Sequence, residues 1–128
     1  MSDLKKRIKA VDDIQKEVVH VDEWGEDIEV RGMDGIGRAE FMKNAYDEDG
    51  KPIISELWPE MVMATCYETG TDNKLFGPDD KEWLIKKNGR ALSKLALVGM
   101  KLSGISDEAR TDIKNGSSAE QNEDSTSP

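Results

Sequence analysis

The sequence predicts an α+β fold: a small, mostly α-helical domain with an N-terminal β-hairpin and a disordered acidic C-terminal tail. Apolar residues alternate with polar ones over residues 18–31, as strands with one buried face require. Apolar residues recur at helical intervals over residues 89–103. The last fourteen residues contain no aromatic and no branched aliphatic side chain, so they cannot bury enough surface to offset the entropy of ordering.

Length and charge limit the domain count and the partners. The 128 residues fit one domain, which we place at residues 1–106, and residues 107–128 are expected to form a short helix or linker and the polar tail. The net charge of −9 argues against nucleic acid, because phosphates would be repelled. No apolar run approaches the roughly 20 residues of a membrane span, and the N-terminus lacks a signal-peptide segment. We therefore expect a soluble, cytoplasmic protein.

The first expected element is a short amphipathic helix. Leu4, Ile8, Val11 and Ile14 follow one another at helical intervals, and Ser2 is available as the N-cap. The basic residues of this segment are expected to form a solvated face.

The β-hairpin follows. Its connection, "DEWGED", is longer than a two-residue turn, and Gly25 can supply the positive φ that other residues resist. Trp24 in this turn has two interpretations, a hydrophobic lid over the end of the hairpin or an exposed anchor for a partner. The apolar positions of the two strands are Val19, Val21, Ile28 and Val30.

Two helices are expected between the hairpin and residue 70. The first enters near residue 36 with Asp34 as its cap, and the turn "DEDGKP" follows it. The second is predicted from about residue 57 to residue 68, with Pro59 in its first turn, where the missing N–H does no harm. Its β-branched and aromatic content leaves a strand as the alternative.

The C-terminal third predicts two more helices. One begins at Pro78, because proline presets φ and the following aspartates favour the positive end of a helix. Asn88 or Gly89 separates it from the next helix, which should end at Ser103, since Gly104 suits a left-handed C-cap. The apolar stripe of this last helix includes Leu92, Leu95 and Leu102.

No group of residues has the spacing of a catalytic, cofactor or metal site. An EF-hand alignment of "DEDG" places Asp47 and Asp49 at ligand positions but Ala45 at the first one, so a surface turn is the better interpretation. His20 is the single histidine, and with no second histidine or cysteine nearby in sequence it is expected to form neither a zinc site nor a nucleophilic triad. Cys66 has no cationic neighbour in sequence and is predicted to be a small core residue.

Several short motifs follow one another over residues 18–106. They comprise the hairpin with its turn, a glycine step into a helix with Arg-x-x-Phe, an acidic helix start and a Leu-Ser-Gly ending. The residues that form them are Val19, Val21, Glu23, Trp24, Gly25, Ile28, Val30, Arg31, Met33, Gly35, Arg38, Phe41, Leu75, Phe76, Asp79, Asp80, Leu102, Ser103 and Gly104. Taken in this order, the motifs resemble those of the tail assembly chaperones of long-tailed bacteriophages. Asp22 and Met33 depart from the usual residues, and "NAYDEDGKPIISELWPE" matches no motif.

The resemblance implies a non-enzymatic protein without a cofactor. Such a chaperone binds the tape measure protein, keeps it soluble and helps recruit tail tube subunits in the host cytoplasm, and it is absent from the mature virion. Self-association is a further expectation. The alternative is a structural head–tail or tail-tube component retained in the virion, although such proteins usually carry more β-structure. The residues expected to bind a partner are Trp24, Leu92, Leu95 and Leu102.

Overall fold

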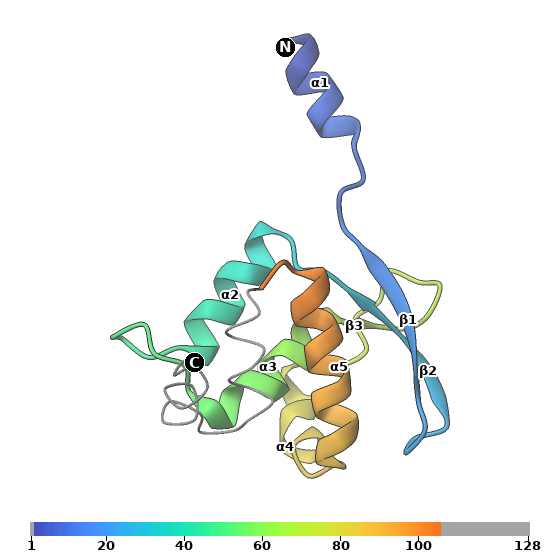
Figure 1. Cartoon of the computed structure of the whole chain (residues 1–128), viewed down its shortest axis with the longest axis vertical. Helices are drawn as coiled ribbons and strands as arrows, with labels where there is room; N and C mark the ends of the chain where they lie inside the picture. The colour runs from blue at the N-terminus through green and yellow to red at the C-terminus, as the bar shows by residue number, and fades with distance from the viewer. Residues whose placement is uncertain (1, 106–128) are drawn as a thin grey trace, which may run out of the picture.

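The computed structural model describes residues 2–105, and the predicted linker and tail over residues 107–128 lie outside this range. The α+β class and the N-terminal hairpin are confirmed (Figure 1). The elements are α1 (Asp3–Ala10), β1 (Lys16–Val21), β2 (Glu26–Arg31), α2 (Gly35–Ala45), α3 (Ile54–Thr65), β3 (Cys66–Tyr67), the 3₁₀ helix η1 (Pro78–Asp80), α4 (Lys81–Leu84) and α5 (Gly89–Leu102).

The sheet has three antiparallel strands in the order β1-β2-β3. The predicted hairpin is confirmed, with Val19 opposite Ile28, and Gly25 adopts a φ of 63° in the turn. The strand β3 lies in the segment for which the sequence left a strand as the alternative, although its two residues are too short to show an alternating pattern. Its pairing with Glu29 and Val30 makes β2 the central strand.

The helix predicted over residues 57–68 is shifted toward the N-terminus. It begins at Ile54, because the N–H groups of Glu56 and Leu57 already bond to the carbonyl of Ile53. It ends at Thr65, since the next two residues pair with β2 instead. Pro59 consequently lies in the second turn and not in the first, where the sequence had placed it. The alternative of a strand holds only for Cys66–Tyr67.

The predicted helix starts are confirmed at three places. The Asp34 side chain accepts a hydrogen bond from the N–H of Gly37 at 2.8 Å and caps α2. The Asn88 side chain accepts from two N–H groups at the start of α5, which separates α5 from α4. The segment that follows Gly77 begins as expected at Pro78, although its first turn is 3₁₀ and α-helix follows only at Lys81. Side-chain caps satisfy N–H groups that have no partner within the helix.

The end of α5 also matches the prediction. The helix stops at Leu102, Ser103 is its C-cap, and Gly104 adopts a φ of 74°. The N–H of Ile105 then bonds to the carbonyl of Met100 at 2.9 Å, and the Ile105 side chain is buried. This is the apolar residue after a left-handed cap that folds back on the last turn.

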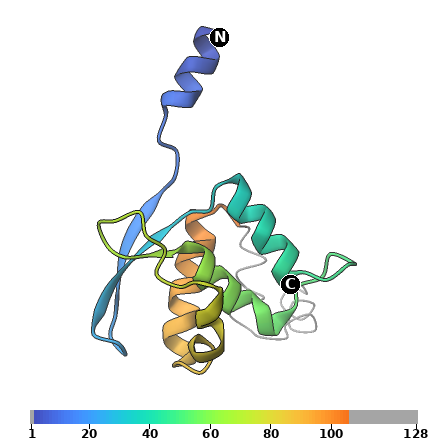
Figure 2. The same ribbon diagram turned by 180° about the vertical axis from the view of Figure 1, so that it is seen from behind.

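The two longest helices form the centre of the molecule. Figures 1 and 2 show α3 and α5 between the sheet and α2, and α5 contacts both α3 and β2. The helices α3 and α5 approach closely at Gly99, where a Cβ would lie 2.6 Å from Oγ1 of Thr65. One cluster of buried residues joins all these elements: Val19, Val21, Ile28, Val30, Phe41, Ala45, Leu57, Met61, Val62, Cys66, Phe76, Leu84, Ala91, Leu92, Leu95, Ala96, Met100 and Ile105.

Motif residues far apart in the sequence meet where α5 ends. The backbone N–H of Met33 donates to Oγ of Ser103 at 3.0 Å, and Nη1 of Arg38 donates to the carbonyl of Ser103 at 2.7 Å. Gly32 packs so tightly there that a Cβ would lie 2.5 Å from the carbonyl oxygen of Leu102. The segment Gly32–Met33 after β2, the arginine of α2 and the Leu-Ser-Gly ending therefore form one junction.

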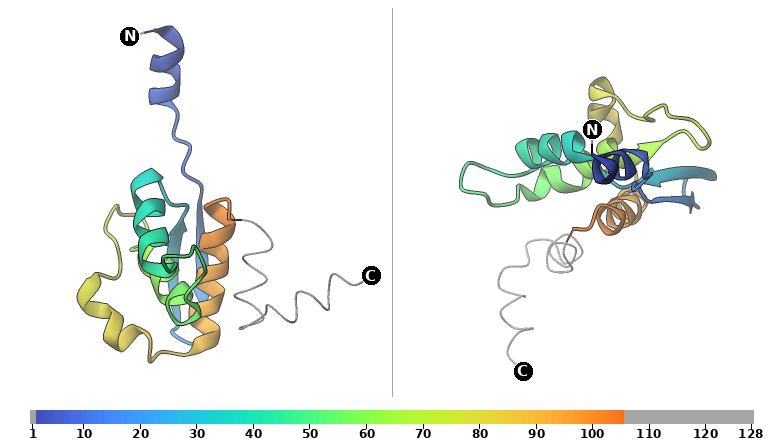
Figure 3. Two further views of the ribbon diagram at one scale, coloured as in Figure 1. Left: turned by 90° about the vertical axis from the view of Figure 1, so that its left-hand side faces the viewer. Right: turned by 90° about the horizontal axis from the view of Figure 1, so that it is seen from above.

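The helix α1 stands apart from the rest of the molecule. Ser2 caps it as expected, with its side chain accepting from the N–H of Lys5 at 3.1 Å. The helix ends at Ala10, so Ile14 lies beyond the stripe on which the sequence had placed it. Figures 1 and 3 show α1 projecting from the end of β1, and none of its residues is buried. Among the helices of residues 2–105, none has the length and apolar content that a bilayer crossing requires.

Candidate functional site

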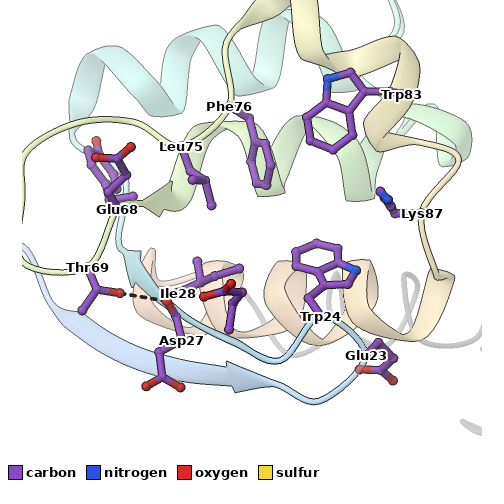
Figure 4. Close-up of a pocket in the computed structure, with 12 residues that line it drawn as sticks. Glu23, Trp24, Asp27, Ile28, Glu68, Thr69, Leu75, Phe76, Trp83 and Lys87 are labelled. Carbon is purple, nitrogen blue, oxygen red and sulfur yellow. Dashed lines mark hydrogen bonds between the residues drawn. The ribbon is translucent and has the colours of Figure 1, made fainter.

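A groove of about 700 Å³ lies beside the turn of the hairpin. One wall comes from the turn and the start of β2, and the other from the segment that runs from β3 to α4 (Figure 4). The residues that line it are Glu23, Trp24, Glu26, Asp27, Ile28, Tyr67, Glu68, Thr69, Leu75, Phe76, Trp83 and Lys87. We call it the aromatic groove.

Aromatic side chains form the apolar surface of this groove. Trp24 from the hairpin turn and Trp83 from α4 point toward one another, with Phe76 beside them (Figure 4). The rings of Phe76 and Trp83 meet edge to face with centroids 5.9 Å apart. Phe76 is buried, whereas Trp83 remains 45 % exposed. An exposed indole fixed on a buried ring is typical of residues that anchor a partner.

Trp24 combines the two interpretations that the sequence left open. It is half-buried and packs against the hydrophobic core, as a lid over the end of the hairpin would. It also lines the groove, where a ligand could reach the exposed part of its ring. Gly25 makes this position available, because its positive φ turns the chain directly after the tryptophan.

The orientation of Trp83 is set by Asp80 at the end of η1. The Asp80 carboxylate accepts from the N–H of Gly77 at 2.7 Å and from Nε1 of Trp83 at 3.0 Å. Both donors favour the charged form, so the hydrogen bond from Gly77, and then that from Trp83, lowers the pKa of Asp80. The Gly-Pro-Asp-Asp helix start thus both begins a helix and holds the exposed indole.

The rim of the groove carries mostly negative charge. Glu23, Glu26, Asp27 and Glu68 line it, against the single lysine Lys87. Glu23 and Glu26 are exposed on the hairpin turn. The arrangement favours a ligand with an apolar face and positively charged flanks.

A buried ion pair ties the far wall of the groove to the sheet. Glu29 is 8 % exposed and accepts from Nε of Arg31 at 2.5 Å and from the N–H of Gly70 at 3.2 Å. The hydrogen bond from Arg31, followed by that from Gly70, lowers the pKa of Glu29. Arg31 also lies over the ring of Tyr67, 4.1 Å from its centroid. These contacts hold the loop after β3 against β2.

The leucines expected to bind a partner lie elsewhere. Leu95 is fully buried and Leu92 is 4 % exposed, so both belong to the core, while Leu102 is half-buried at the end of α5. None of the three lines the aromatic groove. Partner binding by α5 stays a prediction, and it would have to use the half-buried residue.

Trp83 was missed as a candidate site residue. The sequence shows it as one apolar residue of a short helix, and nothing in the local pattern says that its ring stays exposed. The signal that could have found it is the pair of aromatic residues that flank the Gly-Pro-Asp-Asp helix start, Phe76 and Trp83, because such a start turns the chain and can bring both to one surface.

The other sequence candidates are accounted for by structural contacts. Cys66 is fully buried, and burial raises the pKa of its thiol to about 12, so the nucleophilic thiolate is scarce at neutral pH. The Asp47 carboxylate accepts from the N–H groups of Asp49 and Lys51, each at 2.9 Å, as expected of a surface turn. His20 lies on the exposed face of β1 with Nδ1 2.7 Å from Asp27. Within residues 2–105 no three metal-binding side chains come together.

The fold and the groove define a class: a small α+β module with an aromatic groove beside the turn of its N-terminal hairpin. A solved structure with this fold is that of the bacteriophage HK97 tail assembly chaperone, at a TM-score of 0.57 and 17 % sequence identity. The superposition covers 84 % of this chain and 100 % of the HK97 chain, so the likeness extends over all of that solved chain and shows a shared fold. The sequence matches no family model, and no curated protein matches it.

Proposed function

We propose that this protein is a tail assembly chaperone of a long-tailed bacteriophage. The observation that carries the proposal is the fold shared with the complete chain of the HK97 tail assembly chaperone. The motif residues that suggested the same family include Arg38 and Ser103, and the Arg38 side chain donates to the carbonyl of Ser103. Agreement between sequence motifs and an independent likeness of fold supports the proposal more than either does alone.

In this role the protein binds the tape measure protein and keeps it soluble, acting by binding and without catalysis. Long helical proteins expose apolar stripes that aggregate, and a helix-in-groove contact covers such a stripe. The aromatic groove is the surface that suits this task, through Trp24 and Trp83. Its acidic rim favours stripes flanked by lysine and arginine.

The protein further helps recruit tail tube subunits and acts in the host cytoplasm. It leaves before the virion is complete, as a reversible contact permits. A second contact with the tail proteins through the end of α5, at Leu102, remains part of the proposal.

Co-expression with the tape measure protein tests the proposal. The wild-type chain should keep the tape measure protein soluble and co-purify with it. Trp83→Ala removes an exposed anchor and should lower the co-purified amount roughly tenfold or more, as loss of a tryptophan hot spot does. Ile36→Ala is the matched control, because Ile36 is 73 % exposed on α2 and lies outside the groove.

Melting curves of both variants separate binding from folding. If Trp83→Ala and the control bind equally well while both remain folded, the groove is not the client site. Mass spectrometry of purified particles addresses the alternative. If the protein is present stoichiometrically in mature virions and does not bind the tape measure protein, the chaperone proposal is wrong and the protein is a structural tail component.

A further inference from the structure

A groove of about 340 Å³ lies at the start of α3. It runs between the first residues of α3 and the turn that joins α4 to α5, and these segments lie at the same end of the molecule (Figure 1). We call it the α3 groove. It shares only Lys87 with the aromatic groove, so the two are separate surfaces. Its apolar lining residues are Ile54, Leu57, Trp58, Pro59, Ile85 and Leu92.

Two isoleucines of the α3 groove are open to solvent. Ile54, the first residue of α3, is 46 % exposed, and Ile85, which follows α4, is 50 % exposed. Leu57 and Leu92 line the same groove and are buried in the core. Exposed aliphatic side chains that gather around one concave, core-backed surface mark a site that a partner covers.

Trp58 gives the α3 groove a fixed aromatic wall. It is half-buried and packs against the hydrophobic core. A Cβ at Gly89 would lie 4.0 Å from Cζ3 of Trp58, so the ring lies against the start of α5. An indole that is already held loses little side-chain entropy when a partner contacts it, which makes it an efficient anchor.

The rim of the α3 groove is basic, although the chain as a whole carries a net charge of −9. Lys87 is the one charged residue among its lining residues. Lys86 and Arg90 stand beside it in the sequence "KKNGR", and both are exposed. Over residues 82–90 these three basic side chains face one acidic one, Glu82. The rim therefore has the opposite charge to that of the aromatic groove.

The acidic residues of α3 belong to a different surface. Glu56 pairs with Lys81, and Glu60 lies 3.0 Å from the same ammonium group. Lys81 and Glu60 line a pocket beside α2, and neither lines the α3 groove. The two carboxylates are thus engaged by a lysine outside the groove, and the basic residues of its rim keep their charge for a partner.

The segment that builds the α3 groove is also where the chain departs from the family motifs. Ile54, Trp58 and Pro59 belong to "NAYDEDGKPIISELWPE", which matches none of those motifs. Motif residues such as Trp24 and Phe76 line the aromatic groove instead. The resemblance to tail assembly chaperones therefore implies nothing about the α3 groove, and its partner has to be inferred from its own chemistry.

We propose that the α3 groove binds an amphipathic segment of a partner protein. The apolar residues of that segment contact the two isoleucines and the indole, and its aspartates or glutamates face the basic rim. An anionic membrane is disfavoured, because it is flat where this surface is concave and would repel the acidic remainder of the chain. The inference does not depend on the proposed function, since it concerns another surface and a partner of the opposite charge.

Binding of a synthetic peptide to the 128-residue protein tests the proposal. The probe is a fluorescently labelled amphipathic peptide with leucines on one helical face and glutamates beside them, and anisotropy measures its binding. Wild type should bind it, and added salt should weaken the binding. Ile54→Asp should weaken it about tenfold or more, as loss of an interface anchor does. Ile36→Asp, an exposed position on α2 outside the groove, should bind like wild type.

Melting curves separate loss of binding from loss of folding. Ile54→Asp should stay folded, because an aspartate in the first turn of α3 favours the positive end of the helix. A wild-type chain that does not bind the peptide, or a folded Ile54→Asp chain that binds it as well as wild type, would overturn the proposal.

A charge exchange tests the role of the basic rim. Lys86→Glu/Arg90→Glu should bind the glutamate peptide several-fold more weakly than wild type. Made together with Trp83→Ala, so that the aromatic groove does not take a basic peptide, it should instead prefer the same peptide with lysine in place of each glutamate. An unchanged preference for glutamate would show that the peptide binds elsewhere.

Two further measurements address other occupants of the α3 groove. If the peptide binds only to a chain that ends at Ile105, the later residues of the same chain cover the groove and the proposal is wrong. If vesicles of phosphatidylserine and phosphatidylcholine bind the protein and displace the peptide, the groove belongs to a membrane surface and the proposal is wrong as well. The experiments contain no tape measure protein, so their outcome is distinguishable from that of the co-expression test.

Discussion

Glu29 shows how one charged residue can be both buried and stabilising. It lies on the central strand with an arginine two residues away and a backbone N–H from the loop after β3. A buried charge is tolerated only when such partners replace its hydration. The pair therefore ties that loop, and with it one wall of the aromatic groove, to the sheet.

The first prediction concerns the acid stability that this residue confers. The pKa of Glu29 is lower in the folded state than in the unfolded chain. Its contribution is therefore present above the unfolded pKa and is lost as pH falls through the folded pKa. Glu29→Gln should reduce the free energy of unfolding by about 1.5–3 kcal/mol at pH 7, as loss of hydrogen bonds to a charged group does.

Urea unfolding at several pH values measures this effect. The difference between wild type and Glu29→Gln should shrink as the pH falls below the ordinary range of a glutamate. A difference that is constant between pH 7 and pH 3 would mean that the charge of Glu29 contributes nothing to stability.

Alternation in the hairpin could not predict the burial of Glu29. The pattern assigns Ile28 and Val30 to the core and Glu29 to the solvent, and the first two assignments are correct. Glu29 is covered because β3 pairs with β2 beside it and Gly70 in the loop after β3 donates to its carboxylate, and both segments lie almost forty residues further along the chain. A local pattern contains no information about such distant cover.

At the scale of elements, the crossing of α3 and α5 depends on one small residue. Gly99 faces Thr65, and a Cβ would lie 2.6 Å from its hydroxyl oxygen and 3.1 Å from its Cβ. Thr65 is held in turn, since its hydroxyl donates to the carbonyl of Met61 at 2.7 Å. The helices α3 and α5 cannot move apart to make room without disturbing the core that they share.

Gly99→Ala should therefore destabilise the protein by about 1–3 kcal/mol, the usual cost of overpacking. Gly35→Ala is the matched control, because Gly35 is also helical but a Cβ there meets nothing within 4 Å. The control should be neutral or slightly stabilising, since alanine favours helix by up to about 1 kcal/mol. Thermal or urea unfolding of the two variants checks this. Equal stability of both would refute a tight crossing.

Element boundaries were predictable where they depend on local chemistry. The cap Asp34 and the left-handed Gly104 act within a few residues, and both were identified correctly. Asn88, the N-cap of α5, was one of the two residues expected to separate α5 from the helix before it. The limits of α3 were wrong because pairing with β2 decides where it ends. The aromatic groove could not be predicted either, because Trp24 and Trp83 are distant in sequence and are brought together only by the tertiary fold.

For the whole molecule, the isolation of α1 is the main feature that amphipathicity could not reveal. The pattern predicts an apolar stripe and says nothing about what covers it. Because α1 buries no residue, deleting residues 2–10 should leave the melting temperature of the dilute protein unchanged. Circular dichroism at low concentration measures this. A decrease of several degrees would show that α1 packs on its own molecule.

The junction at Ser103 has a consequence for the making of the protein. Chains leave the ribosome N-terminus first, so the hairpin and α2 emerge well before α5. The helix α5, which contacts β1 and β2, and Ser103 at its end are synthesised last among residues 2–105. The growing chain must therefore hold an uncovered apolar sheet until translation has passed residue 103. The hydrogen bonds of Ser103 to Met33 and Arg38 can therefore form only after nearly all of residues 2–105 have been synthesised.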